Sequence, residues 1–211
     1  MIRNEVEARE FVLARCDQVA TDRIERYLAA LSEENAKQNL VSTRSLDEAW
    51  VRHLADSAQL LDHVPRGTSN WLDLGTGPGL PGMVLACMRP ESHFVLVEAR
   101  RRRVEWLHYV RELLALANVT IEGSRLEMVQ TFHAEVITAR AFAPLPRLID
   151  LSARFSTDAT LWVLPKGRSG AQELQELPDS LRKMFHVEHS ATDPEAGILV
   201  GKLAKGERMQ A

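Results

Sequence analysis

The first seventy residues carry hydrophobic side chains at helical spacing. Two stripes recur every three or four positions, as on the buried face of a helix. The first stripe contains Ile24, Tyr27, Leu28 and Leu31, and the second contains Trp50, Leu54, Ala58 and Leu61. Ser45 and Glu48 lie just ahead of the second stripe and predict a capping box, in which each side chain binds a free backbone N–H. We therefore expect helices here, joined by a polar connection over residues 38–44.

The pattern changes after the turn-rich segment 65–70. From there, short apolar runs alternate with stretches at helical spacing. Strands are predicted over residues 71–74, 94–97, 119–121, 135–138 and 160–164, with two more near 184–189 and 198–203, and helices over 80–88 and 104–117. Because parallel strands need crossover connections, this alternation predicts a mostly parallel, seven-stranded sheet in which one of the last two strands is antiparallel.

These elements predict an α/β fold of the Rossmann-like kind with an N-terminal helical extension. We expect the extension over residues 1–66, the α/β domain over 67–205 and a short tail over 206–211. The length of 211 residues and a hydrophobic content of 45% are enough for a real core.

Composition narrows the class of protein further. Cys16 and Cys87 form no paired motif, which favours a reducing compartment over a disulfide scaffold. No apolar run approaches the roughly 20 residues of a membrane span, and the first ten residues are too charged for a secretory signal. We therefore expect a cytoplasmic protein without a membrane partner. The net charge of −3 gives no overall attraction for nucleic acid, so RNA would have to bind at a local basic face.

The densest motif is the segment 73–82, Asp-Leu-Gly-Thr-Gly-Pro-Gly-Leu-Pro-Gly, between a predicted strand and a helix. Its glycine spacing also fits a dinucleotide-binding loop. A pyrophosphate, however, needs backbone N–H donors, and Pro78 and Pro81 each remove one. Asp73 places a carboxylate at the strand tip, where it would repel a phosphate but attract the ammonium and sulfonium groups of S-adenosylmethionine. The loop therefore favours S-adenosylmethionine as cofactor.

Polar residues at the ends of the predicted strands extend this candidate site. Gly75 and Gly77 let a ligand approach the backbone. Glu98 ends the second strand, where a carboxylate accepts hydrogen bonds from ribose hydroxyls, although dinucleotide enzymes use an acid there too. Glu127 follows the third strand, Arg140 ends the fourth, and Lys166 follows the fifth. Because ligands bind at the carboxyl ends of parallel strands, we expect these residues to share one site.

Six segments in one order carry a family resemblance: residues 39–40, 52–57, 73–82, 124–127, 140–143 and 164–167. Together they resemble the bacterial ribosomal RNA small subunit methyltransferase G family, also called glucose-inhibited division protein B. The resemblance spans about residues 28–203. One departure is Glu98, where the family often has Asp.

The resemblance implies a class I S-adenosylmethionine-dependent methyltransferase. It implies methyl transfer to N7 of a guanine in 16S rRNA of the small ribosomal subunit, near the decoding centre. It also implies cofactor contacts at Gly75, Leu80, Leu126, Glu127 and Arg140. Guanine N7 carries a lone pair and no proton, so we expect no general base and assign no catalytic side chain.

An RNA substrate would need contacts beyond the cofactor loop. The candidates are Arg52, His53 and Lys166, with Arg101, Arg102 and Arg103 for phosphates and Phe142 for stacking. The run of arginines opposes the dipole at the start of its helix. His186 and His189 would face opposite sides of a strand and have no third ligand, so no metal site is expected. Nothing in the sequence demands more than a monomer.

Three alternatives remain open from the residues alone. An NAD-dependent oxidoreductase has the same glycine spacing but needs a substrate domain, for which little chain is left after residue 203. A non-enzymatic RNA-binding assembly module could have kept a vestigial cofactor fold. A methyltransferase of another substrate would share the cofactor loop.

Overall fold

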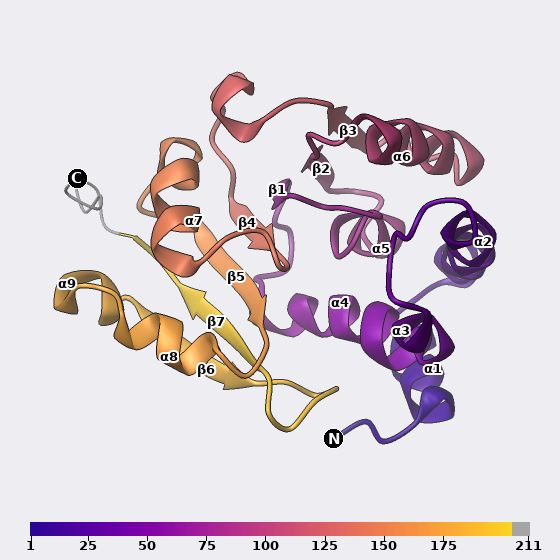
Figure 1. Cartoon of the computed structure of the whole chain (residues 1–211), viewed down its shortest axis with the longest axis horizontal. Coiled ribbons are helices and arrows are strands. Elements are labelled where there is room, and N and C mark those ends of the chain that lie inside the picture. Colours follow the sequence, from indigo (N-terminus) through magenta and orange to yellow (C-terminus); the bar gives the residue numbers. More distant parts are fainter. Residues whose placement is uncertain (204–211) are drawn as a thin grey trace.

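Seven strands form one sheet in the order β3-β2-β1-β4-β5-β7-β6 in the computed structural model, which describes residues 1–203 (Figure 1). The strands are β1 (Asn70–Leu74), β2 (His93–Val97), β3 (Val119–Glu122), β4 (Val136–Ala139), β5 (Leu161–Lys166), β6 (Phe185–His189) and β7 (Gly197–Gly201). The first five pair in parallel, and β7 runs antiparallel to both β5 and β6. The predicted α/β sheet with one antiparallel strand is confirmed. The predicted tail 206–211 lies outside the described residues.

Helices cover both faces of this sheet (Figure 1). Those before β4 are α1 (Glu5–Leu13), α2 (Gln18–Asn35), α3 (Thr43–Asp47), the π-helix η1 (Trp50–Ala55), α4 (Asp56–Ala58), the 3₁₀-helix η2 (Gln59–His63), α5 (Gly82–Met88), α6 (Arg101–Leu113) and η3 (Leu126–Met128). After β4 come α7 (Leu145–Ser152), η4 (Ala153–Phe155), α8 (Gly170–Gln175) and α9 (Asp179–Arg182). Within residues 1–203, no helix combines the length and apolar character needed to cross a membrane.

The side chains of each strand alternate between two hydrophobic cores, as the pleat requires. Trp71 of β1 packs with α2, α5 and α6, whereas Leu72 packs with the residues of α7 to α9 on the other face. The N-terminal helices share the first of these cores with the sheet, through residues such as Ile24 and Leu54. The extension is therefore packed on the sheet rather than tethered to it.

The predicted capping box at Ser45 and Glu48 is wrong. Ser42 is the N-cap, with Oγ accepting from the Ser45 N–H at 3.2 Å, and α3 already ends at Asp47. The segment from Trp50 to His63 instead begins against a carboxylate from α1, because Glu5 accepts the N–H groups of Trp50 at 3.0 Å and Val51 at 2.8 Å. The cap is supplied by tertiary structure, so local sequence could not reveal it.

Two element boundaries differ from the sequence-based expectation. Strand β5 does not stop at Leu164 but continues through Pro165 to Lys166. This is possible because β4 pairs with β5 only as far as Val163, so the missing proline N–H costs no hydrogen bond to β4. Helix α6 begins at Arg101 rather than Val104, which makes the arginine run its first turn.

Candidate active site

The site lies where the direction of strand order reverses. Strand β1 pairs with β2 on one side and β4 on the other, and the carboxyl ends of β1 and β4 meet at the pair Leu74 and Ala139. Open parallel sheets bind ligands in the crevice outside such a switch point. Gly75 follows β1 here, and Arg140 follows β4 as the next residue rather than ending the strand as expected.

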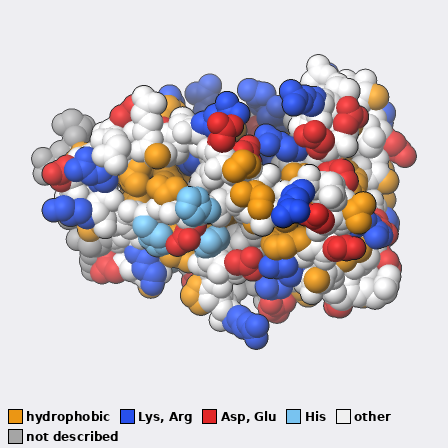
Figure 2. All heavy atoms as spheres, turned by 90° about the horizontal axis from the view of Figure 1, so that it is seen from below, with side chains coloured by type: hydrophobic (Ala, Val, Ile, Leu, Met, Phe, Trp, Pro, Cys, Tyr) orange, Lys and Arg blue, Asp and Glu red, His pale blue; other side chains and the backbone are white. Residues whose placement is uncertain are grey.

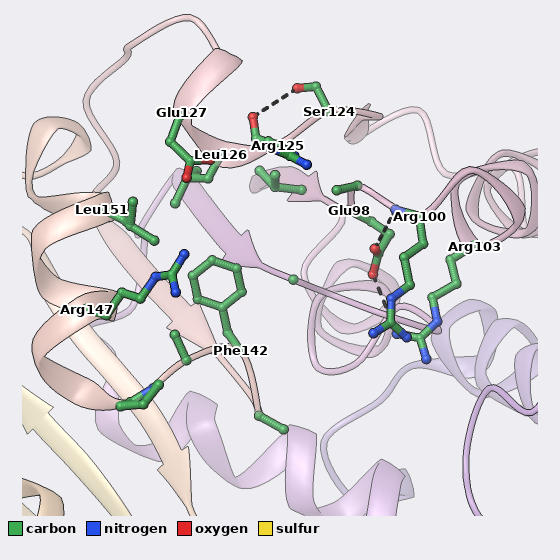
Figure 3. A pocket seen from close by; sticks show the side chains of 16 residues that line it. Glu98, Arg100, Arg103, Ser124, Arg125, Leu126, Glu127, Phe142, Arg147 and Leu151 are labelled. Carbon is green, nitrogen blue, oxygen red and sulfur yellow. Dashed lines mark hydrogen bonds and ion pairs between the residues drawn. The ribbon is translucent and has the colours of Figure 1, made fainter.

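A cavity of about 610 Å³, which we call the first cavity, opens above β1, β2 and β4. Its walls include the predicted residues Gly75, Glu98, Leu126 and Glu127. Phe142 and Arg147 approach from the segment after β4 and from α7, facing Glu98 and Arg103 across the opening (Figure 3). Four predicted cofactor residues from three separate segments therefore converge on one space.

The Glu98 carboxylate is fixed at the mouth of the glycine loop. One oxygen accepts the Gly77 N–H at 3.1 Å and the other accepts the Arg100 N–H at 2.8 Å, while Arg103 lies 3.8 Å away (Figure 3). Glu98 is 6% exposed. Each carboxylate oxygen has a second lone pair, so both can still accept a hydrogen bond from the cavity.

Gly75 leaves a space beside the Phe142 ring that the side chain of any other residue would fill. Its φ is +61°, which favours glycine, and a Cβ built there would lie 2.5 Å from Cδ2 of the Phe142 ring. The ring of Phe142 is half-buried and forms the wall beside the end of β1. A side chain at position 75 would therefore push the ring into the cavity or out of place.

The N–H groups of the glycine loop are largely used inside the protein. Those that donate to protein acceptors belong to Thr76, Gly77, Gly79, Leu80 and Gly82. Pro78 and Pro81 have no N–H to give. A pyrophosphate would need these donors, so the structure argues against the dinucleotide alternative for the same reason that the two prolines did.

Asp73 does not face the cavity as expected. It is 1% exposed and lies beneath the loop, where its carboxylate accepts the Gly82 N–H at 3.0 Å and the Thr138 hydroxyl at 2.9 Å. Burial raises the pKa of Asp73 to about 6, although these hydrogen bonds oppose the shift. Asp73 sits on the face of β1 that packs against α5, and there it joins the loop to β4. Asp73 is therefore not among the residues that line the first cavity, and its contact with the cofactor cation stays a prediction.

The other two loop predictions also concern buried positions. Leu80 is 2% exposed and packs in the core. Gly77 donates its N–H to Glu98 and is not among the residues that line the first cavity. The loop is held from behind as well. The Pro78 carbonyl accepts from the Tyr27 hydroxyl at 3.1 Å and from Trp106 Nε1 at 2.9 Å, so α2 and α6 both anchor it.

A second cavity of about 330 Å³ lies on the other side of Ala141. It brings together four predicted residues: Arg52, His53, Arg140 and Lys166. Ala141 lines both cavities, and its φ of +52° is unusual for a residue with a Cβ. Arg140, which we expected beside the cofactor, therefore lies on the adjoining space.

The cations of the second cavity are held by nearby acceptors. Arg140 Nη1 contacts the Arg52 carbonyl at 3.2 Å, His53 Nδ1 at 3.3 Å and Asp56 at 3.6 Å. Lys166 pairs with Glu173 at 2.7 Å, and Arg52 pairs with Asp193 at 3.2 Å. Lys166 and its acidic partner thus tie the end of β5 to α8.

His53 is a neutral, buried side chain whose ring contacts Arg140 on one side and Ser45 of α3 on the other. An arginine only donates, so His53 Nδ1 accepts and Nε2 carries the proton that reaches Ser45 Oγ at 3.2 Å. Burial, with the charges of Arg140 and Arg52, lowers the pKa of His53 to about 3. The ring therefore stays uncharged at neutral pH and fixes the orientation of Arg140.

A basic groove adjoins the first cavity. Residues 36–39 and 100–103 line it, and Arg100 and Arg103 line both spaces. No side chain caps the start of α6 and no acidic residue stands in its first turn. Arg101 is 92% exposed, with Glu105 as its ion-pair partner. Four arginines at a positive helix end are electrostatically unfavourable, so stability does not explain this arrangement.

Sequence reasoning missed two parts of the site. Arg147, on α7, was not singled out because the first turn of that helix follows the motif without a signature of its own. Asp56 and Ser45 enter the second cavity from the helical extension. Asp56 belongs to the 52–57 segment already noted, and its position four residues after Arg52 was the available signal.

Comparison with known proteins agrees with this geometry. The GidB family, described as rRNA small subunit methyltransferase G, matches residues 20–195. A protein named ribosomal RNA small subunit methyltransferase G from Erythrobacter litoralis is 58% identical over 202 residues, covering 96% of this chain and 98% of that one.

Solved structures resemble the chain in fold alone. A ribosomal protein L11 methylase from Lactobacillus delbrueckii subsp. bulgaricus has a TM-score of 0.57 and 10% identity, covering 74% of this chain and 79% of its own. Fibrillarin from Aeropyrum pernix, solved with S-adenosyl-L-methionine, has a TM-score of 0.50 and 14% identity, covering 64% and 66%. The fold is that of class I methyltransferases, and by family match and sequence identity the chain belongs to the rRNA small subunit methyltransferase G family.

Proposed function

We propose that this protein transfers a methyl group from S-adenosylmethionine to N7 of a specific guanine in 16S rRNA of the small ribosomal subunit, near the decoding centre. The observation that carries the proposal is the meeting of two cavities at Ala141. One is suited to a nucleoside cofactor, and the other is lined by the charged side chains of Arg52, Asp56 and Lys166. Family membership supports the ribosomal substrate.

The residues of the first cavity fit S-adenosylmethionine. Glu98 has lone pairs for two ribose hydroxyls, Leu126 and Phe142 offer apolar surface for the adenine, and Gly75 leaves room beside the strand end. When bound, the cofactor supplies a methyl group that is activated by the positive sulfur. Glu127 stays a predicted contact on the wall, and Arg140 a predicted contact at the boundary of the two cavities.

The chemistry places few demands on the side chains. The N7 lone pair forms the new bond to the methyl carbon while the carbon–sulfur bond breaks, and no proton has to move. The protein's task is then to align two reactants and exclude water, which can contribute roughly 7 kcal/mol or more. The neutral His53 and the paired Lys166 and Arg140 are consistent with a site that orients rather than transfers protons.

RNA contacts are proposed around this opening. Arg52, His53 and Lys166 line the second cavity, and the basic groove offers Arg101 and Arg102 to phosphates. A ribosomal substrate and two unpaired cysteines support a cytoplasmic location. We propose that the protein acts as a monomer.

The test is transfer of labelled methyl groups into small subunits that lack N7 methylation, mapped by borohydride–aniline cleavage at 7-methylguanosine. One cleavage in 16S rRNA is expected with the wild type. Label in RNA without such cleavage would mean that an atom other than guanine N7 is methylated. Cofactor binding without any label would favour a different substrate, and no cofactor binding would favour the assembly-module alternative.

A further inference from the structure

The second cavity adjoins the first cavity, in which we propose that the cofactor binds. Its floor is formed by the carboxyl ends of β4 and β5, one wall by η1 and α4, and the other by residues 190–198 between β6 and β7. A volume of about 330 Å³ lies within the range of small-molecule sites. A base that reacts in RNA must leave its stack and enter such a pocket. Ala141 lines both this space and the first cavity.

One carboxylate in this cavity is held by hydrogen bonds to one of its two oxygens. Asp56 Oδ1 accepts from Gln59 Nε2 at 2.9 Å and from Thr192 Oγ1 at 3.0 Å. Gln59 is itself 3% exposed and bound to Ser190 and Ala191, so the support is stiff. Asp56 Oδ2 has a looser partner, Arg140 at 3.6 Å, and 22% of the Asp56 side chain is exposed.

The other carboxylate of the cavity is less suited to recognition. Asp193 Oδ2 accepts from Arg52 at 3.2 Å and Oδ1 accepts the Glu195 N–H at 3.0 Å, so both oxygens already have close partners. Asp193 also lies on the 190–198 wall, whereas Asp56 contacts Arg140, the residue before Ala141. Among the described carboxylate oxygens of this cavity, Asp56 Oδ2 therefore has the most distant partner.

We propose that the second cavity binds the target guanine and that Asp56 selects it through Oδ2, which accepts hydrogen bonds from the guanine N2 amino group and the adjacent N1–H. This inference rests on the proposed function. Guanine has two adjacent N–H donors on the edge away from N7, so a carboxylate at that edge leaves N7 free to react. Adenine presents the N1 lone pair there instead, which a carboxylate repels. A site with a buried hydrogen-bonding group rejects an analogue that leaves the group unpaired.

The experiment measures coupling between Asp56 and the guanine amino group. Small subunits are reconstituted with 16S rRNA that carries guanine or inosine at the target position. Inosine lacks only the N2 amino group and keeps N7. For the wild type, kcat/KM for methyl transfer is expected to fall at least about ten-fold with inosine, because a hydrogen bond to a charged acceptor is lost.

Asp56→Asn is expected to lower transfer to guanine by roughly 100-fold and to abolish most of the inosine penalty, since the carboxylate no longer meets the amino group. Affinity for S-adenosylmethionine, measured by calorimetry, should change little. Asp62→Asn is the matched control: Asp62 lies on the following helical turn, pairs with Arg15 and is outside the cavity. Asp62→Asn should transfer methyl groups to guanine at the wild-type rate and show the same fall in kcat/KM with inosine.

A merely structural role for Asp56 would lower transfer to both substrates equally, and an unchanged inosine penalty in Asp56→Asn overturns the proposal. Should that variant fail to fold, Thr192→Val removes one donor that holds the carboxylate. It is expected to shrink the penalty, and an unchanged penalty there is equally decisive. Equal transfer to guanine and inosine by the wild type also overturns it. If the wild type methylates no guanine N7, the proposed function itself fails.

Discussion

At the scale of single residues, the site depends on the lack of a side chain at Gly75 and on the uncharged state of the His53 ring. Gly75 combines a left-handed backbone with contact to the Phe142 ring, and His53 remains neutral between two arginines. Both features are invisible in a composition count. Each feature can be tested by a substitution, with the same substitution at another position of the chain as the control.

Gly75→Ala should weaken S-adenosylmethionine binding by at least about ten-fold, because a Cβ 2.5 Å from the ring displaces the wall of the first cavity. The measurement is calorimetric titration of the folded variant. Gly67→Ala is the control, since Gly67 also has a positive φ of +84° but open space around its Cβ. Equal affinity in both variants would contradict a role for Gly75 in shaping the cavity.

His53 should make the protein less stable as the pH falls. Its folded pKa of about 3 lies below the unfolded value near 6.5, so between these values the unfolded chain binds the proton first. The stabilisation is complete above about pH 6.5 and is lost toward pH 3, by at most about 1.4 kcal/mol per pH unit.

Urea unfolding of the wild type and His53→Asn from pH 4 to 8 tests this. The asparagine oxygen can replace Nδ1 as the acceptor for Arg140. The expected result is a difference in unfolding free energy that shrinks with falling pH, because only the wild type loses stability through this group. Asp73, whose raised pKa acts in the opposite sense between about pH 4 and 6, is common to both proteins and cancels. His108→Asn, at an exposed position on α6, should show no such trend.

At the scale of elements, the N-terminal helices pack against the glycine loop and share a core with the sheet. The Tyr27 hydroxyl on α2 and Trp106 on α6 meet at the Pro78 carbonyl. Glu5 on α1 caps η1, which in turn presents His53 to the second cavity. The predicted boundary at residue 66 therefore marks a change of pattern, and a core is shared across it.

Tyr27→Phe removes one of the two donors to the glycine loop while it keeps the packing of the ring. We expect a loss of about 1 kcal/mol in unfolding free energy and a few-fold weaker binding of S-adenosylmethionine. Urea unfolding and calorimetry measure the two effects. Tyr109→Phe, at a 54% exposed position, should change neither. Unchanged cofactor affinity in Tyr27→Phe would show that the loop does not need its anchor on α2.

At the scale of the whole molecule, the net charge is small and one face mixes charges of both signs. The net charge is −3, and the face in Figure 2 shows cationic and anionic side chains interspersed. The basic groove of residues 36–39 and 100–103 is a local exception beside the cofactor site. Only a local contact of this kind can attract an RNA backbone to a chain of this overall charge.

Arg101→Gln should weaken binding to small subunits and lower the slope of log affinity against log salt by about one. Filter binding from low to physiological salt measures the slope. Arg9→Gln is the control, because Arg9 is likewise an exposed arginine paired with a glutamate, on α1 away from the groove. An unchanged slope for Arg101→Gln would remove the groove from the RNA path, and affinity for S-adenosylmethionine should be unaffected in either case.

The sequence by itself determined the order of strands and helices, the cofactor loop and the residues at the strand ends. These follow from local rules: periodicity sets the elements, and parallel strands bring their carboxyl ends to one edge. Glu98, Gly75 and Glu127 were found in this way, Leu126 was implied by the family resemblance, and all four line one cavity.

Only the tertiary structure decided where those side chains point and what holds them. Asp73 turned beneath the loop because it lies on the face of β1 that packs against α5. The cap of η1 came from α1, forty-five residues earlier, rather than from the adjacent Ser45 and Glu48. Arg140 and His53 became partners across 87 residues of sequence. Such contacts depend on how distant elements pack together, and no local pattern of residues encodes that packing.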